Sequence, residues 1–390
     1  MGVAQRAPTH EELEAMKALV REGMEMGAVG LSAGLMYEPG MFSDTEELTA
    51  LAREVAPYGG IYDSHSRNPV AGLLESEQET IEIATAAGIP ARLAHLKAVG
   101  LINRDKTRDL IALVEAARAD GHVVVSDQYP YDGAATALLE DLLVFPDAQD
   151  TVGRFRDVRE IRDGLDAAED LSAIRHATEQ GIDGGFSWVK AVGYGSMRIV
   201  DAPDAPDLVG ENLELLAAAR GIEPFDLLIS LIQGHDAAIM ITLGAIEERE
   251  VQELMVQPWN MIASDGAHVT LDGRSRARHP RSTGSFARVL GHYVRDLELL
   301  TLPEAIRKMS SFPADHLGLH DRGRIAVGKV ADIAVFNPAT VRDRSTWTEP
   351  HDFAEGVRHV LVNGVVAVSD GRVTGELAGT YVKRQNGTGK

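Results

Sequence analysis

The sequence predicts an α/β fold in which parallel strands alternate with helices, followed by a smaller β-rich segment. Strand-like apolar runs begin about 30 residues apart, which is the spacing of βαβ units. A helix pattern lies between successive runs, and short β runs replace this rhythm after Gly323. The rhythm alone fits a (β/α) barrel or a doubly wound open sheet. Neither a Gly-x-Gly-x-x-Gly nor a Gly-x4-Gly-Lys-Ser/Thr motif follows these strands, which argues against nucleotide binding.

Capping signals and turn residues mark the repeated elements. Thr9 and Glu12 form a capping-box pattern before an amphipathic run, and Ser43 and Glu46 form a second one. Glycine or proline residues end each helix pattern, and an apolar run follows. The predicted strands are 28–32, 61–65, 91–95 and 122–127, with a fifth at 259–266, and the predicted helices between them include 74–87 and 105–120.

The rhythm is interrupted at residues 132–258, which we interpret as a large insertion forming one wall of a pocket. This stretch has a charged helix pattern at 155–169, a strand-like piece at 188–193 and a helix pattern at 212–220. The predicted domains are a barrel-type unit at 1–322, which includes the insertion, a β-sandwich segment at 323–384 and a frayed tail at 385–390. Asn363-Gly364 and Asp370-Gly371 are the hairpin signals of the β segment.

Composition excludes several classes of protein. The net charge of −21 argues against nonspecific binding to nucleic acid or to an anionic membrane surface. The chain has no cysteine, so a metal would have to bind His, Asp, Glu or a modified Lys. We see no signal-peptide pattern at the start of the sequence and no apolar run long enough to span a bilayer. We therefore expect a soluble, cytoplasmic protein.

His65 and His95 carry the strongest chemical signal. They lie one repeat apart, each at the carboxyl end of its predicted strand, and Asp265 ends a third strand. Neighbouring parallel strands are about 4.8 Å apart, and the active sites of barrels form at the carboxyl ends. A lone strand-end histidine is more often a hydrogen-bonded structural residue, but the shared register of two of them favours a zinc site with Asp265.

Such a site suits hydrolysis of an unactivated amide. Zinc activates water, and Asp265 is the candidate base that passes the proton to the leaving nitrogen. Lys97 and Arg281 are candidate partners for a small anionic substrate, although each fits a solvated surface charge equally well. Either tyrosine of the Tyr129-Pro130-Tyr131 run could bind substrate or pack in the core. Arg67 is a candidate partner of His65 behind the metal site.

Longer motifs occur along nearly the whole chain in a fixed order. They resemble the N-acyl-D-amino-acid deacylases (D-aminoacylases) of the amidohydrolase superfamily, a resemblance that is weaker for the last two motifs alone. The motifs are 27–40 (GAVGLSAGLMYEPG), 58–67 (YGGIYDSHSR), 95–97 (HLK), 127–131 (DQYPY), 263–266 (ASDG), 279–282 (HPRS), 328–336 (GKVADIAVF) and 360–364 (VLVNG).

The resemblance implies a TIM-type (β/α) barrel of the metal-dependent hydrolase kind and hydrolysis of N-acyl-D-amino acids. It implies that His65 and His95 bind the tightly held zinc, and that Asp265 is the catalytic carboxylate and can touch a second metal. It places Lys97 and Tyr131, or a neighbour of Tyr131, in the substrate site. Arg281 is carried over as a further substrate-binding residue.

Two departures from the family pattern set the remaining expectations. The family's early His-x-His strand has no counterpart here, so residues 28–32 correspond to a fourth barrel strand and about three strands are expected to be missing. Asn68-Pro69 also replaces the family's usual continuation towards an acidic residue. Three hypotheses follow: an active deacylase whose full sequence starts earlier; a truncated, inactive relative, or a half that needs a complementing N-terminal segment or another chain, a homo-oligomer being possible; and a hydrolase of cyclic amides or carbamoyl groups.

Overall fold

A five-stranded parallel sheet forms the centre of the molecule. The computed structural model describes residues 1–146, 158–168, 170–267, 269–270 and 278–385. The strand order is β1-β2-β3-β4-β8, and all four pairs are parallel, as the repeat predicted. The strands are β1 (Gly30–Gly34), β2 (Ile61–His65), β3 (Ala91–Leu93), β4 (Val124–Gln128) and β8 (Asn260–Ile262).

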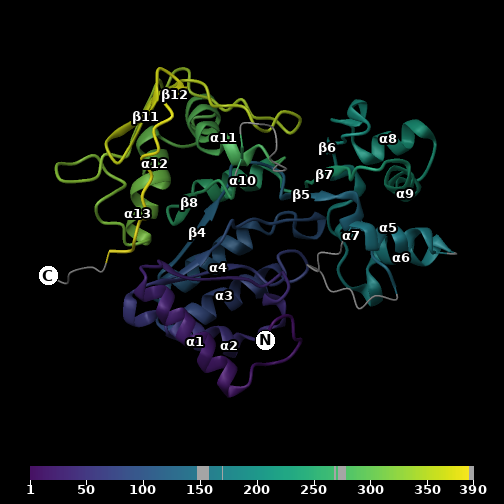
Figure 1. Ribbon diagram of the computed structural model, residues 1–390, viewed down its shortest axis with the longest axis horizontal. Helices are drawn as coiled ribbons and strands as arrows, with labels where there is room; N and C mark the ends of the chain where they lie inside the picture. Colours follow the sequence, from purple (N-terminus) through teal and green to yellow (C-terminus); the bar gives the residue numbers. More distant parts are fainter. Residues whose placement is uncertain (147–157, 169, 268, 271–277, 386–390) are drawn as a thin grey trace.

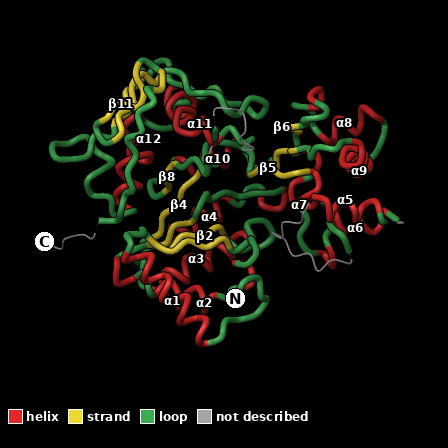
Figure 2. The backbone as a smooth tube through the Cα atoms, in the orientation of Figure 1, coloured by secondary structure: helices red, strands yellow, loops and turns green. Residues whose placement is uncertain are grey.

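Helices cover one side of this sheet (Figure 2). Helix α3 packs on β2 and β3, α4 packs on β4, and α10 packs on β8. The shared core includes Tyr62, Leu93, Leu110 and Trp259, each of which is almost fully buried. The helices are α1 (His10–Glu25), α2 (Thr45–Arg53), α3 (Leu73–Ala87), α4 (Thr107–Ala119) and α10 (Glu248–Met255).

The capping predictions are confirmed for α1 and wrong by one residue for α2. Thr9 and Glu12 form the predicted reciprocal capping box of α1. Asp44, rather than Ser43, caps α2 by accepting a hydrogen bond from the Glu47 amide at 2.8 Å. The Ser43 hydroxyl is already used, because it donates to the Gly40 carbonyl of the preceding turn.

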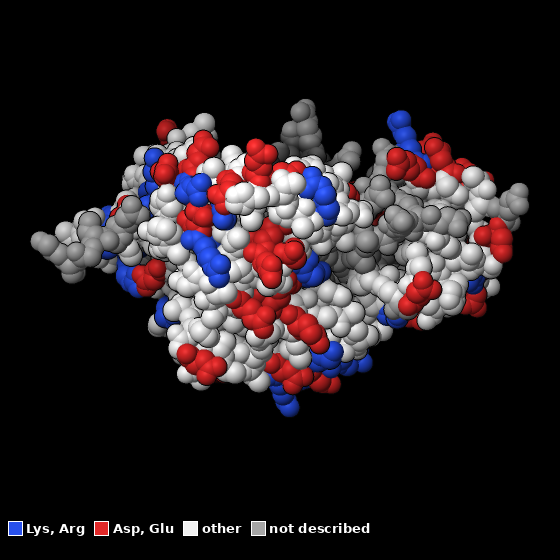
Figure 3. Space-filling model, turned by 90° about the horizontal axis from the view of Figure 1, so that it is seen from below, with Lys and Arg blue, Asp and Glu red and all other residues white. Residues whose placement is uncertain are grey.

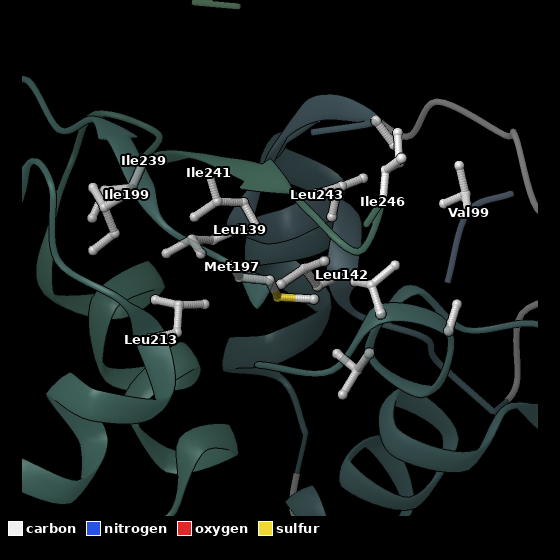
Figure 4. Close-up of a cluster of buried hydrophobic side chains, with 14 of the residues drawn as sticks. Val99, Leu139, Leu142, Met197, Ile199, Leu213, Ile239, Ile241, Leu243 and Ile246 are labelled. Carbon is white, nitrogen blue, oxygen red and sulfur yellow. The ribbon is translucent and has the colours of Figure 1, made fainter. Parts of the chain in front are cut away.

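The chain between β4 and β8 builds a lobe with its own sheet beside the parallel sheet (Figure 1). Its antiparallel sheet has the order β5-β7-β6, formed by β5 (Ala135–Leu138), β6 (Ile199–Asp201) and β7 (Met240–Leu243). Side chains such as Leu139, Met197 and Ile241 fill the core of this lobe (Figure 4). Its other helices are α5 (Val158–Asp166), α6 (Leu171–Gln180), α7 (Trp188–Val192), α8 (Leu213–Arg220) and α9 (Pro224–Gly234).

The strand predicted at 188–193 is wrong, because these residues form helix α7. Ser187 caps this helix by accepting from the Lys190 amide, and Gly193 ends it in a positive-φ conformation. The apolar run was too short for its period to distinguish a strand from one buried helical turn. The helix predicted at 155–169 is confirmed within the described residues as α5, whereas 155–157 and 169 lie outside them.

The C-terminal β segment is confirmed as an antiparallel sheet of order β12-β11-β10-β9. Asn363 and Gly364 have φ values of 48° and 82°, and Asp370 and Gly371 have 47° and 74°, as tight hairpin turns require. Residues 386–390 of the predicted tail lie outside the described residues. The strands are β9 (Ile333–Phe336), β10 (Val357–Val362), β11 (Val365–Ser369) and β12 (Arg372–Val373), preceded by helices α11 (Arg281–Arg288), α12 (Leu302–Ile306) and α13 (Phe312–His316).

The surface reflects the acidic composition. Figure 3 shows Asp and Glu side chains gathered near the middle of the face seen from below. Among the described helices, none combines the length and the apolar character that a membrane span requires.

Candidate active site

The two predicted histidines lie side by side where β2 and β3 end. Their ring centroids are 4.6 Å apart, with an angle of 73° between the ring planes. The Tyr37 ring lies on the other side of His65, at 4.7 Å between centroids. His65 Nε2 is buried and has no hydrogen-bond partner among the described residues. A buried nitrogen without a partner, beside a second imidazole, is the arrangement expected of two histidines that bind a metal.

Burial and nearby cations keep both imidazoles neutral. Desolvation, together with the charges of Lys97 and Arg281, lowers the pKa of His65 to about 4. The same causes, burial first, hold the pKa of His95 well below its ordinary value. A histidine must be neutral to donate its lone pair to a metal. At neutral pH the pair is therefore in the state that binds metal.

Asp265 lies in the same cavity as the two histidines. It follows β8 in a left-handed conformation, with φ of 46°, which is uncommon for a residue with a side chain. The open cavity, of about 510 Å³, is lined by His65, His95 and Asp265 together with charged side chains of the sheet interior. Arg281 holds the Asp265 carboxylate through an ion pair of 2.9 Å.

Two cations lie beside the pair and share one aromatic ring. Lys97 Nζ donates to His95 Nδ1 and to the His95 carbonyl, both at 2.8 Å. It lies 5.4 Å from the centre of the Tyr129 ring, and the Arg281 guanidinium lies 4.6 Å from it. Desolvation lowers the pKa of Lys97 to about 8. The geometry places Lys97, Tyr129 and Arg281 together next to the metal-binding pair.

Tyr131 and Arg67 make their polar contacts with residues other than the histidine pair. The Tyr131 hydroxyl donates to Asp343 at 3.2 Å, and its ring packs against Arg288 and Trp347. Tyr129, the neighbouring candidate, is the tyrosine that contacts Lys97 and Arg281. Arg67 forms a bidentate salt bridge with Glu79 of α3, with both hydrogen bonds at 2.9 Å, and it also donates to the Met41 carbonyl. These contacts take its guanidinium to α3 instead of to His65.

His279 is a site residue that the sequence signal did not single out. It is buried, its Nε2 donates to the Gly133 carbonyl at 3.0 Å, and its Nδ1 accepts the Arg281 amide at 3.1 Å. Burial lowers its pKa to about 3, so it stays neutral in this role. His279 thus fixes the backbone that presents Arg281. The hints in the sequence were its position at the start of the 279–282 motif and in a stretch flanking the predicted pocket.

The described residues fit part of a metal site. Two neutral imidazoles, one with an unsatisfied buried nitrogen, supply two donors. Among the residues that the structure describes, no group of three His, Cys, Asp or Glu side chains converges closely enough to enclose an ion. Asp265 shares the cavity, but its carboxylate is turned to Arg281.

Comparisons with known proteins agree with this fold. The family model described as "Amidohydrolase family" matches residues 165–368. A D-aminoacylase of Alcaligenes xylosoxydans xylosoxydans is 32% identical over 380 residues, which cover 97% of this chain and 66% of the relative. An N-acyl-D-glutamate deacylase of the same organism is 33% identical over 357 residues, covering 92% and 61%.

A crystal structure extends these similarities to three dimensions. The N-acyl-D-glutamate deacylase of Bordetella bronchiseptica, complexed with zinc and a phosphonate inhibitor that mimics the tetrahedral intermediate, has a TM-score of 0.69. It is 31% identical, with 95% of this chain and 67% of that chain covered. The fold prediction, a parallel α/β sheet of the amidohydrolase type with a C-terminal antiparallel sheet, is confirmed.

The chain belongs to the amidohydrolase family. Within that family it is a relative of the D-aminoacylases and N-acyl-D-glutamate deacylases, and it spans 61–66% of the length of the two curated relatives described above.

Proposed function

We propose that the protein hydrolyses the amide bond of N-acyl-D-amino acids, with a metal ion held by His65 and His95 and with Asp265 as the proton carrier. The observation that carries this proposal is the contact of two neutral imidazoles at the strand ends, in one cavity with a carboxylate. The names of the relatives supply the substrate class. Zinc is the metal we propose, because the deacylase of Bordetella bronchiseptica was crystallised with it.

The metal's part is a general one. Bound at the two histidines, zinc would lower the pKa of a water molecule to about 7 and polarise the acyl carbonyl. Asp265 is then the group that takes the proton from water and returns it to the amide nitrogen as the C–N bond breaks. The products are a carboxylate and a D-amino acid. The left-handed backbone of Asp265 turns its side chain into the cavity where this transfer occurs.

The cation cluster suits the carboxylate of such a substrate. Lys97 offers a charged hydrogen-bond donor, and the Arg281 guanidinium can bind a carboxylate through two parallel hydrogen bonds. Because Arg281 pairs with Asp265 at 2.9 Å, a substrate carboxylate that draws Arg281 away would free Asp265 for proton transfer. We therefore assign substrate binding to Lys97, Arg281 and Tyr129.

A second candidate is that the 390-residue chain is inactive until another polypeptide segment completes its metal site. The observation in favour is that the described residues bring no third donor next to the histidines. In this case the chain would bind metal weakly and would not turn over substrate alone.

The test measures metal content and turnover on the same preparations. The purified chain and a His65→Ala/His95→Ala variant are analysed for zinc by plasma mass spectrometry. Both are then assayed with N-acetyl-D-methionine and N-acetyl-D-glutamate, with the L enantiomers and a hydantoin for comparison. Zinc at about one per chain and D-selective release of amine, both lost in the double variant, support the first proposal. Zinc well below one per chain, with no turnover, supports the second candidate, and hydantoin opening without deacylation overturns the substrate class.

A further inference from the structure

His95 does not follow the alternation of its own strand. Ala91 and Leu93 point from β3 into the core shared with the helices, and Arg92 faces the opposite side, where it meets Asp63. Continued alternation would send His95 to the helix side with Ala91 and Leu93. Its ring instead lies 4.6 Å from that of His65. The change of direction occurs at His95 itself, whose φ of 39° lies in the left-handed region.

A single residue of the next strand holds both amides at this turn. The His95 amide donates to Asp127 Oδ1 at 2.6 Å, and the Leu96 amide donates to the Asp127 carbonyl at 2.7 Å. Asp127 is 6% exposed, so these bonds form away from water. A left-handed residue with a side chain persists only where its surroundings hold it there.

Arg92 in turn holds Asp127. One guanidinium nitrogen lies 3.2 Å from Asp127 Oδ2, and Nε donates to Asp63 Oδ1 at 2.8 Å. The Ser32 hydroxyl donates to the other Asp63 oxygen at 3.0 Å. The result is a polar row across β1, β2, β3 and β4, directly beneath the histidine pair. Both oxygens of Asp127 have partners within this row, since Oδ1 accepts the His95 amide and Oδ2 faces Arg92.

We propose that Asp127, anchored by Arg92, is a positioning residue that fixes the left-handed backbone of His95 and so aims its imidazole at the metal. This inference deepens the proposed function and rests on it. Asp127 acts through the His95 amide and does not touch substrate or metal. Its contribution is present in the metal-free protein, so the two ideas can be tested separately.

The decisive experiment measures how fast the His95 amide exchanges its hydrogen with solvent. Hydrogen exchange at His95 and Leu96 is measured in the full chain by mass spectrometry with residue-level fragmentation, without metal. Zinc affinity is measured beside it by competition with a chromophoric chelator. In Asp127→Ala we expect His95 exchange to rise by about tenfold or more and zinc affinity to fall by about tenfold or more, on the scale of a lost charged hydrogen bond.

Asp63→Asn is the matched control. It changes the other buried carboxylate bound to Arg92 but leaves the bond from the His95 amide to Asp127 in place. We expect His95 exchange to stay within about threefold of the original chain, since the direct acceptor is kept. Unchanged His95 exchange in Asp127→Ala, or an equal rise in both variants, would overturn the proposal.

Two further variants guard against a failure of Asp127→Ala to fold. Asp127→Asn keeps an oxygen that can accept the His95 amide, and Arg92→Met keeps both Asp127 oxygens but removes their anchor. We expect intermediate exchange at His95 in each, and no rise in Arg92→Met contradicts the anchoring role. If the unaltered chain binds no zinc, the proposed function fails for this chain alone, while the exchange data still decide the role of Asp127.

Discussion

At the scale of single residues, the sequence could indicate which residues approach the site but not which way each side chain turns. His65, His95 and Asp265 were predicted from strand ends, and the structure brings them to one cavity. The same logic could not choose between Tyr129 and Tyr131, because both follow β4 within four residues. The choice depends on Asp343, which lies 212 positions away and accepts the Tyr131 hydroxyl. Contacts at such separations leave no local pattern.

The two tyrosines therefore give opposite expectations. Tyr131→Phe should lower the free energy of unfolding by about 1.5–3 kcal/mol, because the charged carboxylate of Asp343 loses a hydrogen-bond donor. It should leave KM unchanged. Tyr129→Phe loses a bond to the Ala134 carbonyl and the contact of its hydroxyl with Arg281, but it keeps the ring over which Lys97 and Arg281 lie. Denaturant unfolding and steady-state kinetics on both variants check this. A larger stability loss in Tyr129→Phe would contradict it.

Lys97 is the residue whose loss should affect substrate binding most directly. Lys97→Met keeps a side chain of similar length but removes its charged donor. The value of kcat/KM for N-acyl-D-amino acids should therefore fall by about tenfold to a hundredfold. The fall should appear mainly in KM if Lys97 binds the substrate carboxylate. Arg249→Met, a change at an exposed ion pair on α10, is the control. A fall confined to kcat would argue for a role in the chemical step.

His316 gives the clearest pH dependence of stability. Burial, with Arg92 and Arg384 nearby, lowers its pKa to about 4, and its Nε2 is buried with no hydrogen-bond partner among the residues that the structure describes. Its unfolded pKa is about 6.5, so between these values the unfolded chain binds the extra proton and stability falls as pH falls. His316→Gln should flatten the loss of stability between pH 6.5 and 4. Denaturation midpoints across this range test it, and an unchanged slope contradicts the assignment.

At the scale of elements, periodicity and turn chemistry predicted the parallel sheet, the helices between its strands and the C-terminal hairpins. The repeated βαβ pattern correctly predicted five parallel strands, and the two hairpin turns of the C-terminal sheet followed from Asn-Gly and Asp-Gly. The failures were short elements. Helix α7 occupies a predicted strand because a run of five residues is too short to show a helical or strand period. The cap of α2 moved because the preceding turn already used Ser43.

The position of the α2 cap is open to a direct test. Asp44→Ala should cost about 1 kcal/mol, because the Glu47 amide loses its acceptor. Ser43→Ala should leave that amide protected. Hydrogen exchange at Glu47 distinguishes the two, and faster exchange in Ser43→Ala would return the cap to the position expected from sequence.

At the scale of the whole molecule, the metal links the site to the stability of the fold. If His65 and His95 bind zinc only in the folded chain, free zinc at a hundredfold excess over Kd should add about 2.7 kcal/mol to the free energy of unfolding. The gain should be absent in His65→Ala/His95→Ala. Thermal unfolding with and without zinc measures it. An equal gain in the double variant would place the bound metal elsewhere.

The pairing of β4 with β8 has a consequence for how the chain is made. These strands are hydrogen-bonded neighbours, yet 131 residues of chain separate them. A ribosome adding about 5–20 residues per second needs roughly 7–26 seconds to cross that interval. During this time β4 has been synthesised but its partner has not, so its edge is open to any other strand within reach. Most of the buried side chains of the lobe, such as Leu139, Met197 and Ile241, come from the intervening residues, so the lobe can begin to fold in that interval. Mispairing of β4 should therefore be most frequent after the lobe has been synthesised and before β8 has been synthesised.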